Sequence, residues 1–232
     1  GQDGGTAIAR VLFGDVNPGG RLPVTFPADA SQLQTAGDPM KYPGVAEEED
    51  YSEGVFTGYK WYDAHNLAPA FPFGYGLSYT TFRYRRLHVS AAHGANQVAT
   101  ATIDVTNTGR RLGIAVPELY ISKPATSALP QPPRALVGYD SVRVRPGRTV
   151  RVSFPLDDRS FASWDSAGWR ILAGCYRLAA GSSSRTLTSS VVIARGMHCA
   201  GAGVRLGTAG KFFFPLPATA SARPVAAHAQ RP

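Results

Sequence analysis

Long apolar runs and internal repeats are both absent from this sequence of 232 residues. No stretch approaches 18 consecutive apolar residues, so a membrane-spanning helix is excluded. No repeat at a period of about 20–50 residues is present, so repeat architectures are excluded as well. Charged residues are scarce at 17% but hydrophobic residues make up 44%, a composition typical of a globular protein. The 25 glycines and 18 prolines predict many turns and short strands.

Motifs for several common chemistries are absent too. The sequence has neither a Walker phosphate loop nor a Gly-x-Ser-x-Gly nucleophile elbow. The five histidines show no ligand spacing such as an i, i+4 pair. The two cysteines have only His198 nearby, which is too few ligands for a closed zinc shell. We therefore expect no metal site.

Acidic residues are absent from the last 67 positions. All 16 Asp and Glu residues lie at or before Asp165, together with 16 of the 24 Lys and Arg residues, so residues 1–165 are neutral. The whole net charge of +8 lies in residues 166–232, where the basic residues are spread singly. A nucleic-acid surface needs a basic stripe or cluster, and we therefore expect no nucleic acid among the partners.

The two cysteines, Cys175 and Cys199, are 24 positions apart. Cys175 falls within a predicted strand, and Cys199 follows the last predicted strand. If the chain is exported, a disulfide between them would tie the following segment to the strands. A reactive thiol is disfavoured, because no His and Asn or Asp partnership accompanies either cysteine.

The region from about residue 85 to residue 195 shows strand periodicity. Apolar residues alternate with polar ones over residues 99–106 and again over 150–156, and turn signals stand beside both segments. Further strands are predicted at 114–122, 135–145, 169–180 and 186–194. About seven short strands in about 110 residues favour an antiparallel β-sandwich of immunoglobulin or fibronectin type.

The first 84 residues show a different pattern. Apolar residues at helical spacing over 7–12 predict a short helix, and residues 22–26 predict a short edge strand. A helix this short cannot bury its apolar face alone, so we expect it to pack on protein that this sequence does not contain. Gly1 is not an initiator Met, which also suggests a piece of a longer polypeptide. The aromatic-rich block 51–84 predicts an ordered, irregular loop.

Two carboxylates, Glu53 and Asp63, lie among these aromatic residues. Glycoside hydrolysis needs one carboxylic acid and one carboxylate at a fixed distance, which a sequence does not reveal. Glu53 is a candidate catalytic acid, but we favour a structural role for it. We expect Asp63 to be an anchor that accepts hydrogen bonds from loop backbone.

Blocks of sequence along residues 1–195 resemble one known family. The longest are residues 1–23, GQDGGTAIARVLFGDVNPGGRLP, residues 51–63, YSEGVFTGYKWYD, and residues 71–82, FPFGYGLSYTTF. Shorter blocks follow in the family's order at 105–109, 119–122, 136–139, 164–165 and 181–185. Together they resemble the C-terminal portion of glycoside hydrolase family 3, which ends in a fibronectin type III-like domain.

The resemblance implies a fold and a domain order. The chain is expected to be mainly β, with a fibronectin III/immunoglobulin-like β-sandwich preceded by the C-terminal remnant of an α/β sandwich domain. Residues 1–50 would be this remnant, 51–84 an aromatic-rich linker, 85–195 the sandwich, and 196–232 a tail rich in Ala, Pro and Arg.

The resemblance also implies a parent enzyme, a retaining β-glycosidase of β-glucosidase or β-xylosidase type that needs no metal or organic cofactor. In the family, a barrel domain supplies the aspartate nucleophile, and the glutamate acid/base lies upstream of the segment matched here. We therefore assign no catalytic and no substrate-binding residue and expect the isolated chain to be inactive. Its partners would be the missing barrel and α/β domain and, through the parent, a β-linked glycoside. The cysteine pair and the resemblance imply a periplasmic or secreted location.

Two positions depart from the family pattern, and one alternative function stays open. Lys60 stands where the family commonly has Arg, and Pro117-Glu118 interrupts the predicted strand 114–122, which would make it an edge or bulged strand. The alternative is an autonomous fibronectin III-like module that binds carbohydrate or a partner protein through Trp164 and Trp169. We favour core packing for these two tryptophans.

Overall fold

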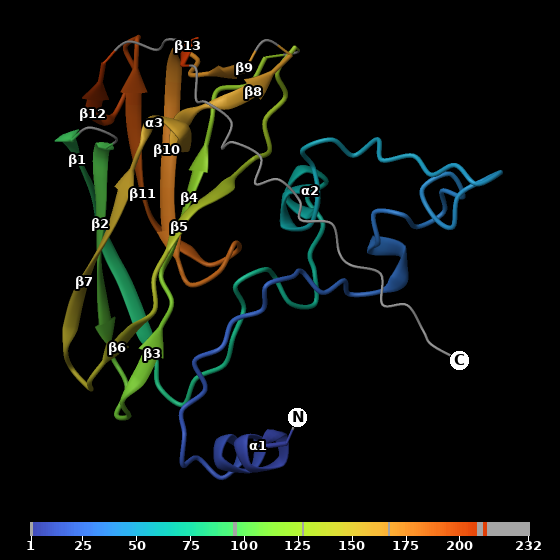
Figure 1. Ribbon diagram of the computed structural model, residues 1–232. Helices are drawn as coiled ribbons and strands as arrows, with labels where there is room; N and C mark the ends of the chain where they lie inside the picture. Colours follow the sequence, from blue (N-terminus) through green and yellow to red (C-terminus); the bar gives the residue numbers. More distant parts are fainter. Residues whose placement is uncertain (1, 95–96, 127, 167, 208–210, 213–232) are drawn as a thin grey trace, which may run out of the picture.

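The computed structural model describes residues 2–94, 97–126, 128–166, 168–207 and 211–212. Strands account for 40% of the described residues and helices for 11%, which confirms the mainly β fold. Two sheets face each other as the layers of a sandwich, and the N-terminal segments extend along one side of it (Figure 1).

The first layer has three antiparallel strands in the order β1 (Phe82–Gly94), β2 (Gln97–Asn107) and β7 (Thr149–Leu156). The second has five, in the order β12 (Ala202–Leu206), β11 (Leu187–Arg195), β10 (Gly174–Gly181), β4 (Glu118–Ser122) and β5 (Ala135–Tyr139). Neighbours in the second layer are antiparallel except β11 and β12, which are parallel.

The core lies between these layers and follows from the strand alternation. In β2, Ala99, Ala101, Ile103 and Val105 have no accessible surface, and the residues between them are mostly half-buried. Residues from both sheets form one buried cluster, which includes Leu178 of β10. Burial of one face per strand is what the period of two predicts.

The predicted strand 114–122 is in fact two strands in different sheets. β3 (Gly113–Ala115) pairs with β6 (Val142–Val144), whereas β4 is an interior strand of the second layer. Pro117 lies between them and has no N–H for a ladder, so the chain changes sheets there. Of the two expected alternatives, the edge strand is wrong, because β4 has a neighbour on each side, and the bulged strand agrees with a register shift between Leu119 and Tyr120 against β5.

The expectation of a tail after residue 196 is wrong for residues 202–206. These residues form β12 on the edge of the second layer, where Val204 and Leu206 pack against the core. Cys175 and Cys199 are joined by a disulfide just before this strand. The side chains of Val204 and Leu206, together with the disulfide, hold this short edge strand against the second layer. Residues 208–210 and 213–232 of the predicted tail lie outside the described residues.

Smaller elements complete the sandwich end. α3 (Asp158–Phe161) follows β7, with its first turn capped by Asp157, whose carboxylate accepts from the Ser160 amide. A hairpin of β8 (Ser163–Asp165) and β9 (Gly168–Arg170) comes next, and β13 (Lys211–Phe212) pairs with β9.

The N-terminal part contains α1 (Gly4–Leu12), a 3-10 turn at Ala30–Gln32 and α2 (Tyr59–Ala64). No residue of α1 is buried. The prediction of a strand over 22–26 is wrong: residues 23 and 24 form a bend, and the segment makes a single isolated bridge, Phe26 with Phe71. An edge strand needs a neighbouring sheet, and the described residues offer none at this place.

Candidate functional site

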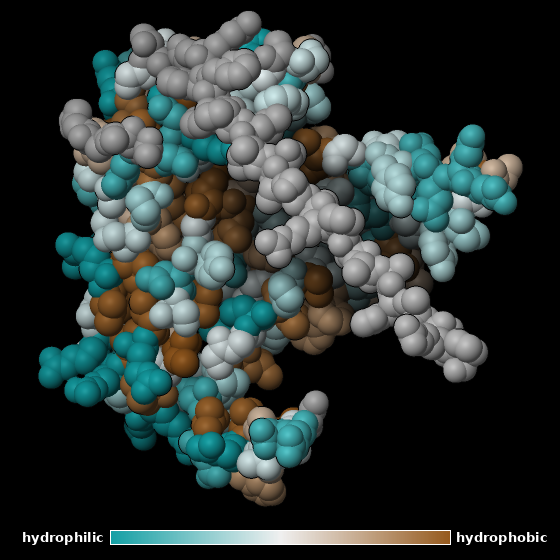
Figure 2. Space-filling model, viewed as in Figure 1, coloured by the Kyte–Doolittle hydropathy of each residue, from teal (hydrophilic) through white to brown (hydrophobic). Residues whose placement is uncertain are grey.

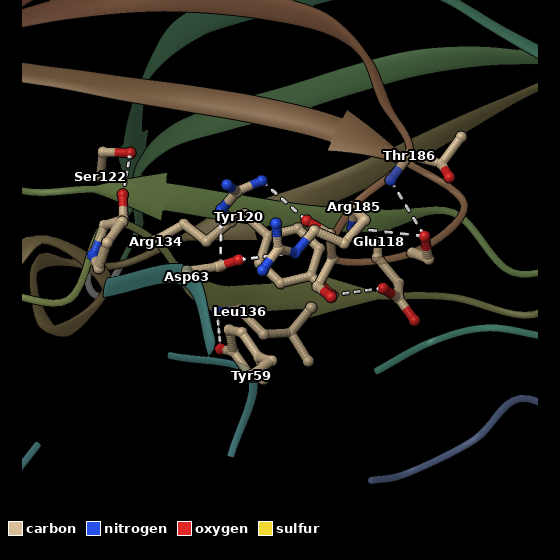
Figure 3. A network of polar contacts seen from close by, with 12 residues as sticks. Tyr59, Asp63, Glu118, Tyr120, Ser122, Arg134, Leu136, Arg185 and Thr186 are labelled. Atoms are coloured by element: carbon tan, nitrogen blue, oxygen red, sulfur yellow. Dashed lines mark hydrogen bonds and ion pairs between the residues drawn. The ribbon is translucent and has the colours of Figure 1, made fainter. Parts of the chain in front are cut away.

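Part of the linker meets the sandwich at a place that we call the junction. It consists of α2, residues 67–76, the start of β5 and the loop 182–186 between β10 and β11 (Figure 3). Two backbone groups of the sandwich donate hydrogen bonds to the linker: the Ser184 amide to the Phe73 carbonyl at 3.0 Å, and the Leu136 amide to the Tyr59 hydroxyl at 2.8 Å. The linker thus contacts both β5 and the loop 182–186 of the sandwich.

Asp63 is the charged centre of the junction. Its side chain has no accessible surface, and its two oxygens lie 2.9 Å from Arg134 Nε and 3.0 Å from Arg185 Nε. Burial raises the pKa of Asp63, and the two guanidinium groups oppose this rise. Asp63 is therefore an anchor, but its partners are two arginines of the sandwich and not loop backbone as expected.

Each of the two arginines also contacts a second segment. Arg134 Nη1 donates to the Ser184 carbonyl at 2.8 Å, and Arg185 Nη2 donates to the Leu67 carbonyl at 2.6 Å. The planar guanidinium presents several donors in fixed directions, so one side chain can hold a carboxylate and a carbonyl at once. The network fixes α2, the linker and the 182–186 loop relative to each other.

A second carboxyl group, Glu118 at the start of β4, is buried beside this network. It accepts a hydrogen bond from the Tyr120 hydroxyl at 2.5 Å, and burial raises its pKa to about 7. Gly74 of the linker lies over it with φ +82°, and a Cβ there would overlap the carboxylate. The Tyr59 ring packs between Phe73 and Tyr120, with centroid distances of 5.0 and 5.8 Å.

The arrangement of this site suits a structural role. We call the buried Asp63 and its partners Arg134 and Arg185 the lock. Asp63 is fully buried and paired, and Glu118 is 4% exposed, so neither carboxyl group is open to a substrate. Removing one partner of a buried ion pair leaves an uncompensated charge, which is strongly destabilising. The junction therefore holds the linker in a fixed position on the sandwich.

Glu53, the candidate acid from the sequence, lies elsewhere on the linker. Its carboxylate pairs with Lys41 Nζ at 3.4 Å. Glu53 and Asp63 have separate cationic partners, so the described structure does not join them into an acid/base pair. The absence of a catalytic residue from this chain stays a prediction.

The two tryptophans of the β8–β9 hairpin differ in burial. Trp164 is 54% exposed, so the expectation of core packing is wrong for it. Trp169 is half-buried, packs against the core and carries the Arg159 guanidinium over its ring at 4.1 Å. The two residues are paired across the hairpin, so their indoles lie on the same face of it, and they differ in how far they extend over the core.

The sequence analysis did not identify Glu118, Arg134 or Arg185 as site residues. Glu118 was singled out only because it follows Pro117 in a predicted strand. A glutamate in an otherwise apolar strand was the available signal, since a buried carboxyl group needs partners. In the described residues no group of three potential metal ligands comes together, and no helix is long and apolar enough to cross a membrane.

Comparison with known proteins identifies both parts of the chain. Residues 1–79 match the glycosyl hydrolase family 3 C-terminal domain, and residues 115–184 match the fibronectin type III-like domain. The chain belongs to the C-terminal region of glycosyl hydrolase family 3. The resemblance inferred from the sequence blocks is thereby confirmed.

Relatives of this family 3 region carry the names of glycosidases. It is 36% identical over 190 residues to thermostable β-glucosidase B of Acetivibrio thermocellus, which covers 81% of the chain and 25% of that protein. It is 38% identical over 198 residues to an exo-α-(1→6)-L-arabinopyranosidase of Bifidobacterium longum, covering 84% and 25%. The chain thus spans about a quarter of the length of these curated relatives.

Solved structures agree with this family 3 assignment. The β-glucosidase DesR of Streptomyces venezuelae, in complex with D-glucose, superposes with a TM-score of 0.76 at 39% identity, over 81% of this chain and 24% of that one. A family 3 β-glucosidase of Bifidobacterium adolescentis gives a TM-score of 0.77 at 33% identity, over 95% of this chain and 30% of that one.

Proposed function

We propose that this chain is the C-terminal, structural part of a retaining β-glycosidase of β-glucosidase or β-xylosidase type. The catalytic carboxylates would lie in a barrel and an α/β domain upstream, and this region would hold the α/β domain in place. Its relatives carry glycosidase names, and the chain spans only about a quarter of their length, which supports the proposal. The domain boundaries at residues 50 and 84 belong to the same proposal.

The observation that carries the proposal is the uncovered apolar surface of residues 1–84. Of the 19 exposed large hydrophobic residues in the described part of the chain, 15 lie in this segment, and among its described apolar side chains only Tyr62 and Tyr84 are buried. Figure 2 shows hydrophobic surface on α1 and on the segments near α2. Exposed apolar surface of this extent marks an interaction site. The most exposed members are Ile8, Leu12, Phe13, Tyr42, Tyr51 and Leu77.

The junction indicates how the sandwich would position this apolar surface. Asp63 and its two arginines bind the linker to the sandwich, whose buried core includes only Tyr84 from the linker. The sandwich would therefore act as a rigid support that presents residues 1–84 to the upstream domains. The disulfide between Cys175 and Cys199 suits an oxidising compartment, so we further propose a periplasmic or secreted location.

The test is hydrolysis of p-nitrophenyl β-glucoside, β-xyloside and α-L-arabinopyranoside. The 232-residue chain is compared with the same chain joined to upstream family 3 domains. We expect turnover only by the longer protein, because the chain alone lacks a nucleophile and an acid. Turnover by the chain alone that is lost in Glu53→Gln, but kept in the control Glu49→Gln from the same loop, would overturn the proposal.

A further inference from the structure

A pocket of about 960 Å³ opens beside the junction, on the side where the β8–β9 hairpin lies. This size is in the range of small-molecule sites. Its walls come from α2, the loop between β4 and β5, and the hairpin, elements that lie near each other in Figure 1. The lining residues that bear on its chemistry are Lys60, Lys123, Gln131, Ser163, Trp164 and Trp169.

Two tryptophans supply one wall of the pocket. Trp164 and Trp169 meet edge to face, with ring centroids 5.5 Å apart, and Trp164 is 54% exposed. Ser163 Oγ donates to Gln131 Oε1 at 2.9 Å, which places an amide and a hydroxyl group beside the indoles. A flat apolar ring with hydrogen-bonding groups at its edge suits a ring-shaped, hydroxylated ligand.

Two lysines supply the charge of the pocket. Lys60 lies on α2, and Lys123 follows β4 and donates a hydrogen bond to the Ala162 carbonyl. Burial, together with the nearby positive charge of Lys60, lowers the pKa of Lys123 to about 8. Among the described lining residues the one carboxylate is Asp165, which pairs with Arg170 at 2.9 Å. The two lysines therefore face the pocket without an anion.

From this geometry we infer that the pocket binds an acidic pyranose, a sugar ring that carries a carboxylate or a phosphate. The anion would lie between Lys60 and Lys123, and the ring would contact Trp164. That the ligand is a sugar rests on the proposed function; that it is anionic rests on the two lysines. Lys60 is next to Tyr59 on α2, but successive helical residues point about 100° apart, so it is free of the Asp63 lock.

Binding is measured by calorimetry on the 232-residue chain with glucuronate, glucose 6-phosphate, glucose and inorganic phosphate. We expect the two acidic sugars to bind at least about tenfold more tightly than glucose, because a charge-assisted hydrogen bond contributes at least this factor. They should also bind more tightly than inorganic phosphate, which cannot contact the indole. Equal binding of glucose, equal binding of phosphate, or no binding at all would each overturn the inference.

Variants locate the site. Lys60→Met keeps the apolar stem and Trp164→Ala removes the indole, and each should weaken glucuronate binding about tenfold. The matched controls are Lys41→Met, from the Glu53 pair, and Tyr139→Ala, an exposed aromatic residue of β5 outside this pocket. Controls that weaken binding as much as the pocket variants would contradict the assignment.

A second readout does not depend on the variants folding. In the wild-type chain with ¹³C-methylated lysines, glucuronate should raise the pKa of Lys123, because a bound anion favours the ammonium form. An unchanged Lys123 titration at saturating glucuronate would place the anion elsewhere and overturn the inference. Glycosidase activity enters neither measurement, so an empty pocket leaves the proposed function standing, and an inactive full-length enzyme leaves the binding result intact.

Discussion

Two buried carboxyl groups in the junction have opposite electrostatic surroundings. Asp63 lies between two guanidinium groups, which compensate its charge. Glu118 receives one hydrogen bond from Tyr120 and only a distant influence from Arg21. A buried carboxylate without a close cation favours its protonated form. The ionised form of Asp63 therefore stabilises the junction, whereas ionisation of Glu118 destabilises it.

The substitution Glu118→Gln should make the stability of the chain less dependent on pH. The pKa of Glu118 is about 7 in the folded chain, against an ordinary value of 4.5. Folding therefore favours the proton, and the wild-type chain loses stability as pH rises from about 4.5 to 7. Glutamine keeps an acceptor for Tyr120 but cannot ionise, so above pH 7 the variant should gain up to about 3 kcal/mol relative to wild type.

Urea unfolding at pH 4 and at pH 8 measures this difference. The gain should be near zero at pH 4, where the carboxyl group is protonated in both states. The control is Glu49→Gln, whose carboxylate is on an exposed loop beside Tyr51. The explanation fails if the free energies of unfolding of Glu118→Gln and wild type differ by the same amount at pH 4 and at pH 8.

At the scale of elements, strand positions were more predictable than strand ends. Residues 99–106 and 150–156 alternate clearly, and β2 and β7 contain them. β12 escaped prediction because its five residues include a glycine and an arginine, and its parallel pairing with β11 depends on contacts distant in sequence. Strand propensity says little about such an edge, since packing decides it.

The disulfide and β12 form one testable unit. Cys199 is buried just before β12, and the closed loop back to Cys175 spans 24 positions. The double substitution Cys175→Ser and Cys199→Ser should destabilise the chain by about 3 kcal/mol, because the unfolded state regains the freedom of the loop. Hydrogen exchange should rise first in residues 202–206, the edge strand beyond the link.

The same experiment has an internal control in the other layer. Amides in the centre of β2, which has a neighbour on each side, should keep their protection in the double variant. Exchange that rises equally in β2 and β12 would show that the disulfide supports the whole sandwich. The disulfide would then stabilise more of the sandwich than the edge strand alone.

At the scale of the whole molecule, the two halves of the chain bury their apolar residues very differently. The cluster between the sheets runs from Tyr84 to Ile193, whereas α1 buries nothing. The short apolar helix was predictable from the sequence, whereas its packing on a neighbouring domain stays a prediction. The arginine lock was not predictable, because it joins residues 63, 134 and 185, and no local pattern reports a contact across such distances.

Limited proteolysis of the isolated chain should separate these halves. Cleavage needs local opening, and residues 1–84 have few buried apolar contacts to resist it, whereas residues 85–195 contain the core. We expect early cuts in residues 28–50 and later survival of a fragment that begins near β1, identified by mass spectrometry. The longer protein with upstream domains should resist the early cuts, because those domains would cover the surface. If residues 1–84 of the isolated chain resist as long as residues 85–195, the exposed surface is stable without a partner, and the support role proposed for the sandwich loses its basis.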